Sequence, residues 1–152
     1  MTRRLTLLLV ISSLSPLTSV MADELRDFTS DGCSAFPDGT REDKELWHSC
    51  CVLHDLAYWK GGNSEERKAA DHALKFCVEA VGKPDIAKLM LAGVRVGGTP
   101  WLPTQFRWAY GWRWLRGYRS VDEEEARQVA EKMEAALALV EQQGAVAPTE
   151  DN

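Results

Sequence analysis

The sequence of 152 residues lacks two features that would place it in common functional classes. Apart from a short apolar run near the N-terminus, no stretch approaches the roughly 20 apolar residues of a transmembrane helix. Positive charge is not in excess either, since 18 basic residues face 23 acidic ones, which argues against general nucleic-acid binding. Internal repeats and low-complexity blocks are also absent, so a repeat architecture is not expected.

The first 22 residues have the pattern of a cleaved secretory signal peptide. Arg3 and Arg4 precede a short apolar run at residues 5–11, and residues 20–22 precede Asp23 in a sequence typical of a cleavage site. The alternative is a buried N-terminal helix. Without the signal, we expect one domain over residues 23–144 and a disordered tail over 145–152, in a periplasmic or secreted protein. Its net charge would be −7, from 16 basic and 23 acidic residues.

Cysteine is scarce, and its four positions all follow the expected signal peptide: Cys33, Cys50, Cys51 and Cys77. An even number of cysteines in an oxidising compartment predicts two disulfides. Three pairings exist in principle, but a bond between the adjacent Cys50 and Cys51 would strain the peptide between them. We therefore expect two bridges that connect these neighbours to Cys33 and Cys77, in either order.

Turn residues and apolar periodicity predict a mainly α-helical fold. Residues 23–30 form a lead-in that buries Leu25 and Phe28, and residues 31–39 form a loop. The expected helices begin near residues 40–43, 63–64, 84 and 120–123, and end near residues 61–62, 82, 97–98 and 144. Ser120 and Glu123 form the capping box expected for the last helix. The apolar face expected for the second helix consists of Ala69, Ala70, Ala73, Phe76, Cys77, Ala80 and Val81.

Residues 99–119 do not fit a regular pattern. Aromatic residues alternate with Arg, Ala and Gly, which is compatible with a strand, an aromatic loop or an irregular helix. No acidic residue occurs between positions 86 and 120, whereas six basic residues do. Such a segment suits a lipid–water interface. We favour the other interpretation, in which the aromatic rings cover the first two helices and the arginines pair with the acidic last helix.

His54 and Asp55 are the candidate functional residues of the first helix. Cys50 lies one helical turn before His54, Cys51 lies one turn before Asp55, and Tyr58 follows one turn later. If Cys50 were bonded to Cys77 between antiparallel helices, Asp71 would lie within about 3 Å of the axial level of His54. A bond from Cys51 to Cys33 would place the loop that contains Asp31 beside Asp55.

A histidine that is hydrogen bonded to a carboxylate through one ring nitrogen can use the other as a general base. No serine nucleophile is indicated, because Ser49 has no elbow motif around it, so activated water is the expected attacker. Asp55, Asp31 and loop carbonyls offer hard oxygen ligands, which suit Ca²⁺ rather than Zn²⁺. A cation there would polarise an ester carbonyl.

The run CCVLHDLAY at residues 50–58 resembles the active-site signature of the secreted phospholipase A2 family. The similarity covers roughly residues 28–81 and includes Asp71, six positions before Cys77, and Cys33, which follows Asp31 and Gly32. The resemblance implies two antiparallel helices preceded by a calcium-binding loop and joined by disulfides Cys33–Cys51 and Cys50–Cys77. It further implies the following roles: His54 as the water-activating base, Asp71 as its partner, Tyr58 as a support for Asp71, and Asp55, Asp31 and the Gly32 carbonyl as calcium ligands.

Two departures from the family pattern stand out. Ala57 occupies the position of a cysteine that is common in the animal enzymes, so one of their bridges is missing. The loop at residues 31–39 has fewer glycines than the animal calcium loop and resembles the microbial form, in which an aspartate side chain contributes. For this reason we prefer Asp31 and the Gly32 carbonyl over the Ser34 carbonyl as ligands.

The resemblance implies calcium-dependent hydrolysis of a glycerophospholipid ester by a secreted enzyme that binds membranes peripherally. The alternative is a non-catalytic module that binds a lipid or a protein partner through the surface rich in arginine and tryptophan. His48 and His72 do not share a helical face with His54, and both are expected to be solvated. A zinc site formed by His48, His54 and the cysteines is disfavoured, because the thiols are needed for the bridges.

Overall fold

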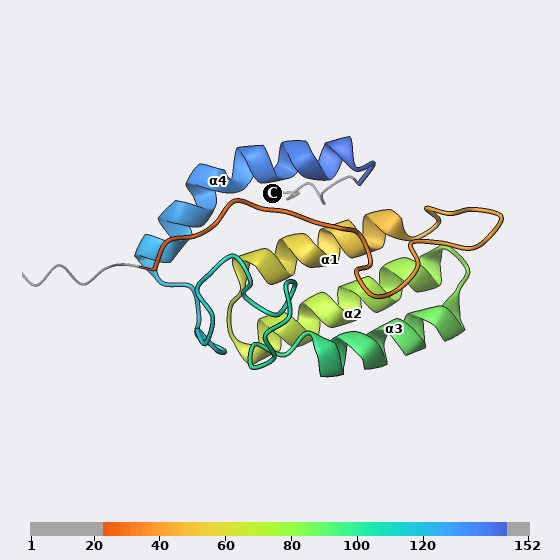
Figure 1. The fold of residues 1–152 in the computed structure, drawn as a ribbon, viewed down its shortest axis with the longest axis horizontal. Coiled ribbons are helices and arrows are strands. Elements are labelled where there is room, and N and C mark those ends of the chain that lie inside the picture. The colour runs from red at the N-terminus through yellow and green to blue at the C-terminus, as the bar shows by residue number, and fades with distance from the viewer. Residues whose placement is uncertain (1–22, 146–152) are drawn as a thin grey trace, which may run out of the picture.

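The computed structural model describes residues 23–145, in which four helices and no strand occur (Figure 1). The mainly α fold is thus confirmed for this part of the chain. The expected signal peptide, residues 1–22, and residues 146–152 of the expected tail lie outside the described residues. No helix between residues 23 and 145 is long and apolar enough to cross a membrane. The helices are α1 (His48–Lys60), α2 (Ser64–Ala80), α3 (Pro84–Gly97) and α4 (Glu123–Gln142).

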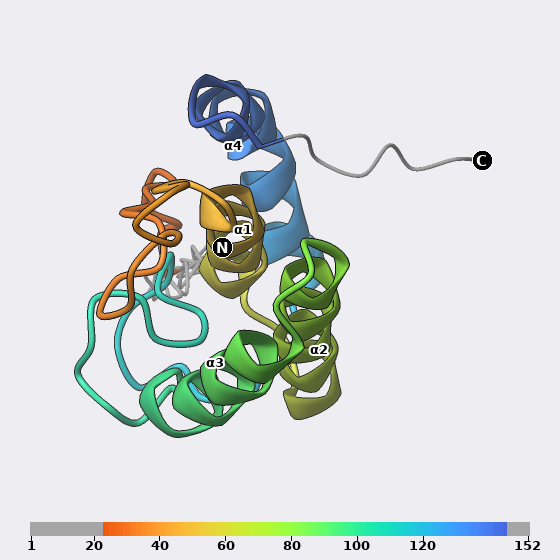
Figure 2. The same ribbon diagram turned by 90° about the vertical axis from the view of Figure 1, so that its right-hand side faces the viewer.

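Short turns join α1, α2 and α3, which lie side by side with each antiparallel to the next (Figure 1). α4 packs against α1 on the side away from α3 (Figure 2). The extended residues 23–30 run beside α1 and α4 and bury Leu25 and Phe28, as predicted. The irregular segments 31–47 and 99–119 both lie on one side of α1 (Figure 2).

Two disulfides fix the position of α1. Cys33 is bonded to Cys51, and Cys50 is bonded to Cys77, with Cα–Cα distances of 5.0 and 5.7 Å. The pairing implied by the family resemblance is therefore confirmed. The first bridge attaches the loop at residues 31–39 to α1, and the second joins α1 to α2.

The start of α1 was predicted near residues 40–43, and this is wrong, because α1 begins at His48. The preceding residues fold back on themselves: the Trp47 N–H donates to the Asp38 carbonyl at 3.0 Å. A side chain at Gly39 would place its Cβ 2.1 Å from the carbonyl oxygen of Asp43, so this turn requires glycine. The acidic residues near position 42 belong to the turn and not to a first helical turn.

The N-terminus of α2 is as predicted, with Asn63 and Glu66 in a capping box. Its buried face differs, because Phe76 is 60% exposed. Apolar periodicity pointed to the wrong face, since two charged residues, Arg67 and Asp71, occupy the interior. The buried residues of α2 are Arg67, Ala70, Asp71, Leu74 and Val78.

Both ends of α4 also need correction. The capping box consists of Asp122 and Glu125, not of Ser120 and Glu123. The Asp122 carboxylate accepts from the Glu125 N–H at 2.9 Å, and the Glu125 carboxylate accepts from the Asp122 N–H at 3.1 Å. Ala145, which was assigned to the disordered tail, is buried in the core, and its N–H donates to the Val140 carbonyl at 3.1 Å.

Residues 99–119 form an irregular segment of turns, and its buried rings cover the C-terminal end of α1. Trp108 donates its indole N–H to the Gly62 carbonyl at 2.8 Å, and Trp112 donates to the Lys60 carbonyl at 2.7 Å. The Lys60 carbonyl is one of those that a helix end leaves without partners, and Gly62 lies in the turn between α1 and α2. The predicted core role of the aromatic residues is confirmed for these two rings, whereas Trp101 and Trp114 are about half exposed.

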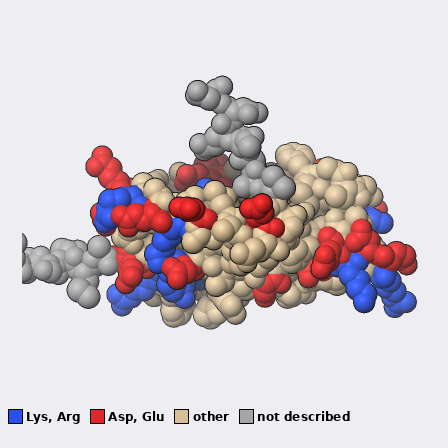
Figure 3. Space-filling view, turned by 90° about the horizontal axis from the view of Figure 1, so that it is seen from above, with Lys and Arg blue, Asp and Glu red and all other residues tan. Residues whose placement is uncertain are grey.

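The predicted pairing of the arginines with the last helix holds only in part. Arg116 donates to the Glu125 carboxylate at 2.7 Å, and Arg119 contacts the same carboxylate. Arg107 and Arg113 form no ion pair with the described residues. Seen from the α4 side, basic and acidic groups are intermixed at both ends of the molecule, so this face has no continuous basic patch (Figure 3).

Candidate active site

Two helices bring His54 and Asp71 into contact. The His54 Nε2 lies 3.1 Å from Asp71 Oδ1, and both side chains are buried. The Tyr58 hydroxyl donates to the same oxygen at 2.5 Å. Burial and the neighbouring Asp71 raise the pKa of Tyr58, so its hydroxyl keeps its proton and serves as a donor. The proximity of Asp71 to His54 agrees with the helix register set by the Cys50–Cys77 bridge.

The protonation of His54 follows from this contact. An ionised Asp71 accepts a hydrogen bond from Nε2–H, which leaves Nδ1 as the unprotonated nitrogen. Burial lowers the pKa of His54, although the hydrogen bond to Asp71 works in the opposite direction. The imidazole is therefore neutral at neutral pH and able to accept a proton.

Two arginines that were not predicted as site residues stand on the far side of the Asp71 carboxylate. Arg95 Nε lies 2.9 Å from Asp71 Oδ2, in an ion pair whose angles do not make a hydrogen bond. Arg67 Nε donates to the Tyr58 hydroxyl at 3.1 Å and lies 3.9 Å from Asp71 Oδ2. Their positive charges offset the cost of burying a carboxylate that is 0% exposed.

Arg67 also connects the site to α3 and to the irregular segment. Its guanidinium donates to the Tyr118 hydroxyl at 2.5 Å and to the carbonyls of Val94 and Arg95 at 2.8 and 3.0 Å. The one signal in the sequence that could have revealed it is the spacing of four residues between Arg67 and Asp71 on α2.

His54 lies in the wall of a cavity of about 630 Å³. The cavity extends from His54 and Asp55 along α3, where Leu89 and Met90 line it, and Phe106 of the irregular segment also contributes to its mostly apolar wall. Two glycines of α3, Gly93 and Gly97, also line it, and a Cβ at either position would meet no atom within 4 Å. A long apolar group can therefore lie beside α3 with a polar group near His54.

The predicted calcium ligands Asp55, Asp31 and Gly32 line the same cavity as His54. Asp55 is buried, and its carboxylate accepts one hydrogen bond, from the Ser30 hydroxyl at 2.7 Å. Burial raises the pKa of Asp55 to about 8, and the negative charges of Asp31 and Asp38 add to this effect. A carboxylate that is so poorly compensated suits a bound cation.

The side chains alone do not complete a metal site. Within residues 23–145, no group of three or more His, Cys, Asp or Glu side chains is arranged to hold a metal ion. Two carboxylates and loop carbonyls would make up the ligands, which is a donor set suited to Ca²⁺. The residues present therefore fit the predicted cation.

Asp38 and His48 support the loop and were not predicted to do so. The Asp38 carboxylate accepts from the Cys33 N–H at 2.8 Å and lies 3.2 Å from His48 Nδ1. A Cβ on Gly32, whose φ is +77°, would lie 2.3 Å from Asp38 Oδ1. His48 is thus half-buried against the loop and not simply solvated, whereas His72 is exposed as predicted.

Comparisons with protein-family models, curated proteins and solved structures find no significant match for this chain.

Proposed function

We propose that this protein is a calcium-dependent hydrolase of the phospholipase A2 type. It would cleave a glycerophospholipid ester with activated water and release a fatty acid and a lysophospholipid. The observation that carries the proposal is the contact of a buried, neutral His54 with Asp71 at one end of an apolar cavity. The adjacent Asp55 lacks a cationic partner among the described residues and adds the second half of the site.

His54 acts as the general base in this proposal. Its Nδ1 takes a proton from water as the water oxygen attacks the ester carbonyl carbon. The resulting imidazolium is stabilised by Asp71, which holds Nε2–H. His54 then returns the proton to the alcohol oxygen that leaves. Tyr58 and Arg95 act through Asp71, because each contacts its carboxylate and neither is expected to touch the ester.

Asp55, Asp31 and the Gly32 carbonyl would hold the calcium ion. When bound, the ion supplies positive charge that polarises the ester carbonyl. Asp38 keeps the loop in place through the hydrogen bond that it accepts from the Cys33 N–H and through its contact with His48. The apolar wall of α3 accommodates the acyl chain and excludes bulk water from the ester.

The test is the release of fatty acid from phospholipid vesicles, with calcium and with a chelator. His54→Asn should reduce the rate by about 10²–10⁴-fold, because it removes the base. The matched control is His72→Asn, since His72 is exposed on α2. Full activity of His54→Asn, or full activity in chelator, would refute the proposed mechanism.

A second candidate function rests on the exposed apolar side chains of the irregular segment: Trp101, Leu102, Trp114 and Leu115. These residues suit a non-catalytic module that binds lipid or a protein partner. Protein that sediments with anionic vesicles, hydrolyses no lipid and shows no calcium-dependent rise in melting temperature would favour this candidate.

A further inference from the structure

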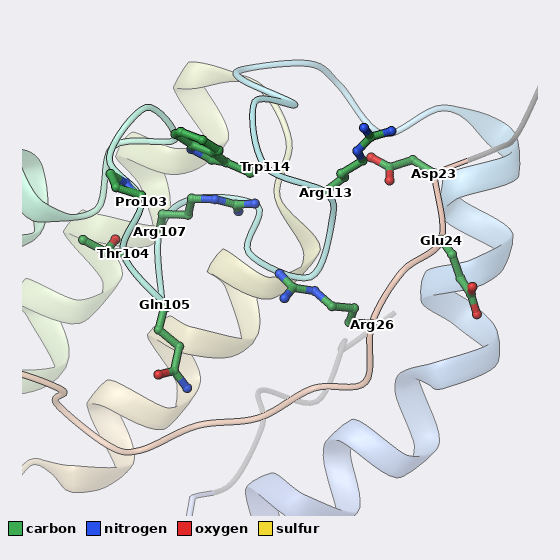
Figure 4. A pocket seen from close by; sticks show the side chains of 9 residues that line it. All are labelled: Asp23, Glu24, Arg26, Pro103, Thr104, Gln105, Arg107, Arg113 and Trp114. Atoms are coloured by element: carbon green, nitrogen blue, oxygen red, sulfur yellow. The ribbon is translucent and has the colours of Figure 1, made fainter.

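A second cavity, of about 570 Å³, lies between residues 23–26 and the irregular segment (Figure 4). It contains three arginines, of which two point their guanidinium groups toward one another from opposite sides. These two are Arg26, from the extended lead-in, and Arg107, from the irregular segment. The third, Arg113, is directed away from them and lies next to Asp23 in this view.

Arg107 is a buried cation that forms no ion pair within residues 23–145. Its side chain is 5% exposed, and its hydrogen bonds within the described part of the chain all go to backbone carbonyls. Nη1 donates to the Ala109 carbonyl and Nη2 to the Trp112 carbonyl, both at 2.9 Å. Burial lowers the pKa of Arg107, and the positive charge of Arg26 adds to this effect, whereas the negative charge of Asp23, which also lines the cavity, acts in the opposite direction.

Arg26 brings a second positive charge to the same place. Its Nη2 contacts the Tyr110 carbonyl and lies 3.4 Å from the Trp112 carbonyl, which Arg107 also contacts. Two guanidinium groups on one carbonyl oxygen repel each other, and burying such a charge without a counter-ion costs free energy. An anion between the two groups would offset both costs.

Donors remain for such an anion. Arg26 Nε and Nη1 and Arg107 Nε form no hydrogen bond within residues 23–145. The carbonyls of the irregular segment hold both guanidinium groups in place, so little ordering is needed when a ligand binds. The arrangement presents the Nε–Nη1 edge of Arg26 and one further donor, Arg107 Nε, at the wall of a cavity.

We propose that Arg26 and Arg107 bind a phosphate group in this cavity. Phosphate fits better than a carboxylate because it offers more than two oxygens to donors on two guanidinium groups and carries up to two negative charges. The same chemistry is present in inorganic phosphate, in a soluble phosphate ester and in the head group of a phospholipid. Trp114 lines the cavity and is 50% exposed, so it reports on binding.

This site is separate from the proposed active site, and the inference does not rest on the proposed function. The two cavities share Thr104 and Gln105 in their walls. A phosphate bound in the second cavity would therefore also restrain Thr104 and Gln105 in the wall of the His54 cavity.

The experiment follows the indole N–H signals of the six tryptophans by NMR while inorganic phosphate is added at constant ionic strength. Trp114→Phe identifies the signal of Trp114. We expect a saturable shift of this signal and none for Trp47, which is buried in a hydrophobic cluster with Cys50, Cys51 and Leu74 and does not line the cavity. Arg26→Gln should weaken phosphate binding by about tenfold or more, because it removes a charged hydrogen-bond donor. Arg127→Gln, which removes an exposed arginine of α4, should leave it unchanged.

Arg26 is exposed, so its variant tests the site even if substitution of the buried Arg107 prevents folding. Three results would each overturn the proposal: no saturable shift of Trp114, equal binding of acetate, or equal weakening by both variants.

Phosphatidylglycerol vesicles distinguish the sources of the phosphate. Competition by inorganic phosphate and loss of sedimentation in Arg26→Gln would identify the head group as the ligand. Phosphate binding without any effect on sedimentation would identify a soluble ligand.

Discussion

Two buried carboxylates flank His54, and the protein surrounds them differently. On the α2 side, Asp71 contacts His54, the Tyr58 hydroxyl and the Arg95 guanidinium. On the loop side, Asp55 accepts a hydrogen bond only from Ser30 among the described residues, and burial and then its acidic neighbours raise its pKa. Both side chains are at most 5% exposed, so solvent compensates neither.

The Asp71 side of the site is therefore complete within the described part of the protein, whereas the Asp55 side is not. The charge of Asp71 is balanced by residues of the chain itself, which suits a group that must orient an imidazole at all times. The charge of Asp55 is not balanced within residues 23–145, which suits a group that binds a cation from solution. Substitutions of the two carboxylates should therefore have opposite consequences for stability.

The largest effect is expected from Asp71→Asn. The amide cannot stabilise the imidazolium electrostatically and does not enforce the required tautomer, so the rate of fatty-acid release should fall by about 10³-fold. The variant should also unfold at a lower temperature, because Arg95 loses its counter-charge. Asp85→Asn, on the exposed side of α3, is the matched control. A rate within a few-fold of the wild type would show that Asp71 has no part in catalysis.

Asp55→Asn should have the reverse effect on stability when calcium is absent. The variant removes a poorly compensated acid, so at pH 8 in chelator it should unfold at a higher temperature than the wild type. Saturating calcium should stabilise the wild type by about 2.7 kcal/mol at 100 times its dissociation constant, and the variant much less. Thermal unfolding with and without calcium measures both quantities. An equal calcium response in the two proteins would exclude Asp55 as a ligand.

The raised pKa of Asp55 also predicts a pH dependence. Since its folded pKa of about 8 lies above the ordinary value of 3.8, the folded protein keeps a proton that the unfolded chain releases in this window. The free energy of unfolding of the calcium-free protein should therefore fall by about 1.4 kcal/mol per unit as pH rises from 4 to 8, and then level off.

Urea unfolding at several pH values measures this slope. The lowered pKa of His54 acts in the opposite direction below pH 6.5, so the difference between the wild type and Asp55→Asn isolates the contribution of Asp55. Identical slopes in the two proteins would show that Asp55 titrates normally and is not the uncompensated carboxylate of the site.

The Asp71 side of the site is better predicted from the sequence than the segments around it. The contact of His54 with Asp71 was accessible because two regular helices and one disulfide fix their register. The boundaries at Asn63 and Pro84 carry local signals, namely a capping box and a proline in the first turn. Each of these features has a signal in the sequence: a cysteine pair, a capping residue or a proline.

Features that depend on hydrogen bonds to particular backbone carbonyls were missed. The first turns before α1 are held by a bond from Trp47 to Asp38, which no local propensity indicates. The inward orientation of Arg67 depends on carbonyls of α3. The course of residues 99–119 is set by carbonyls at the end of α1 and in the turn after it, to which Trp112 and Trp108 donate. Spacing alone cannot identify these partners.

The smallest effect, and the finest test of the comparison, is expected from Arg95→Gln. Arg95 is partly exposed and its ion pair with Asp71 is not aligned as a hydrogen bond, so solvent weakens its contribution. We expect a fall in rate of about three- to tenfold, with little change in substrate affinity, because Arg95 positions Asp71 without touching the ester. Arg95→Lys should recover part of the rate, since it keeps the charge. Arg95→Gln could instead change the calcium affinity more than the rate. That result would show that the Asp71 side and the Asp55 side are coupled, and it would contradict the view that the two carboxylates act independently.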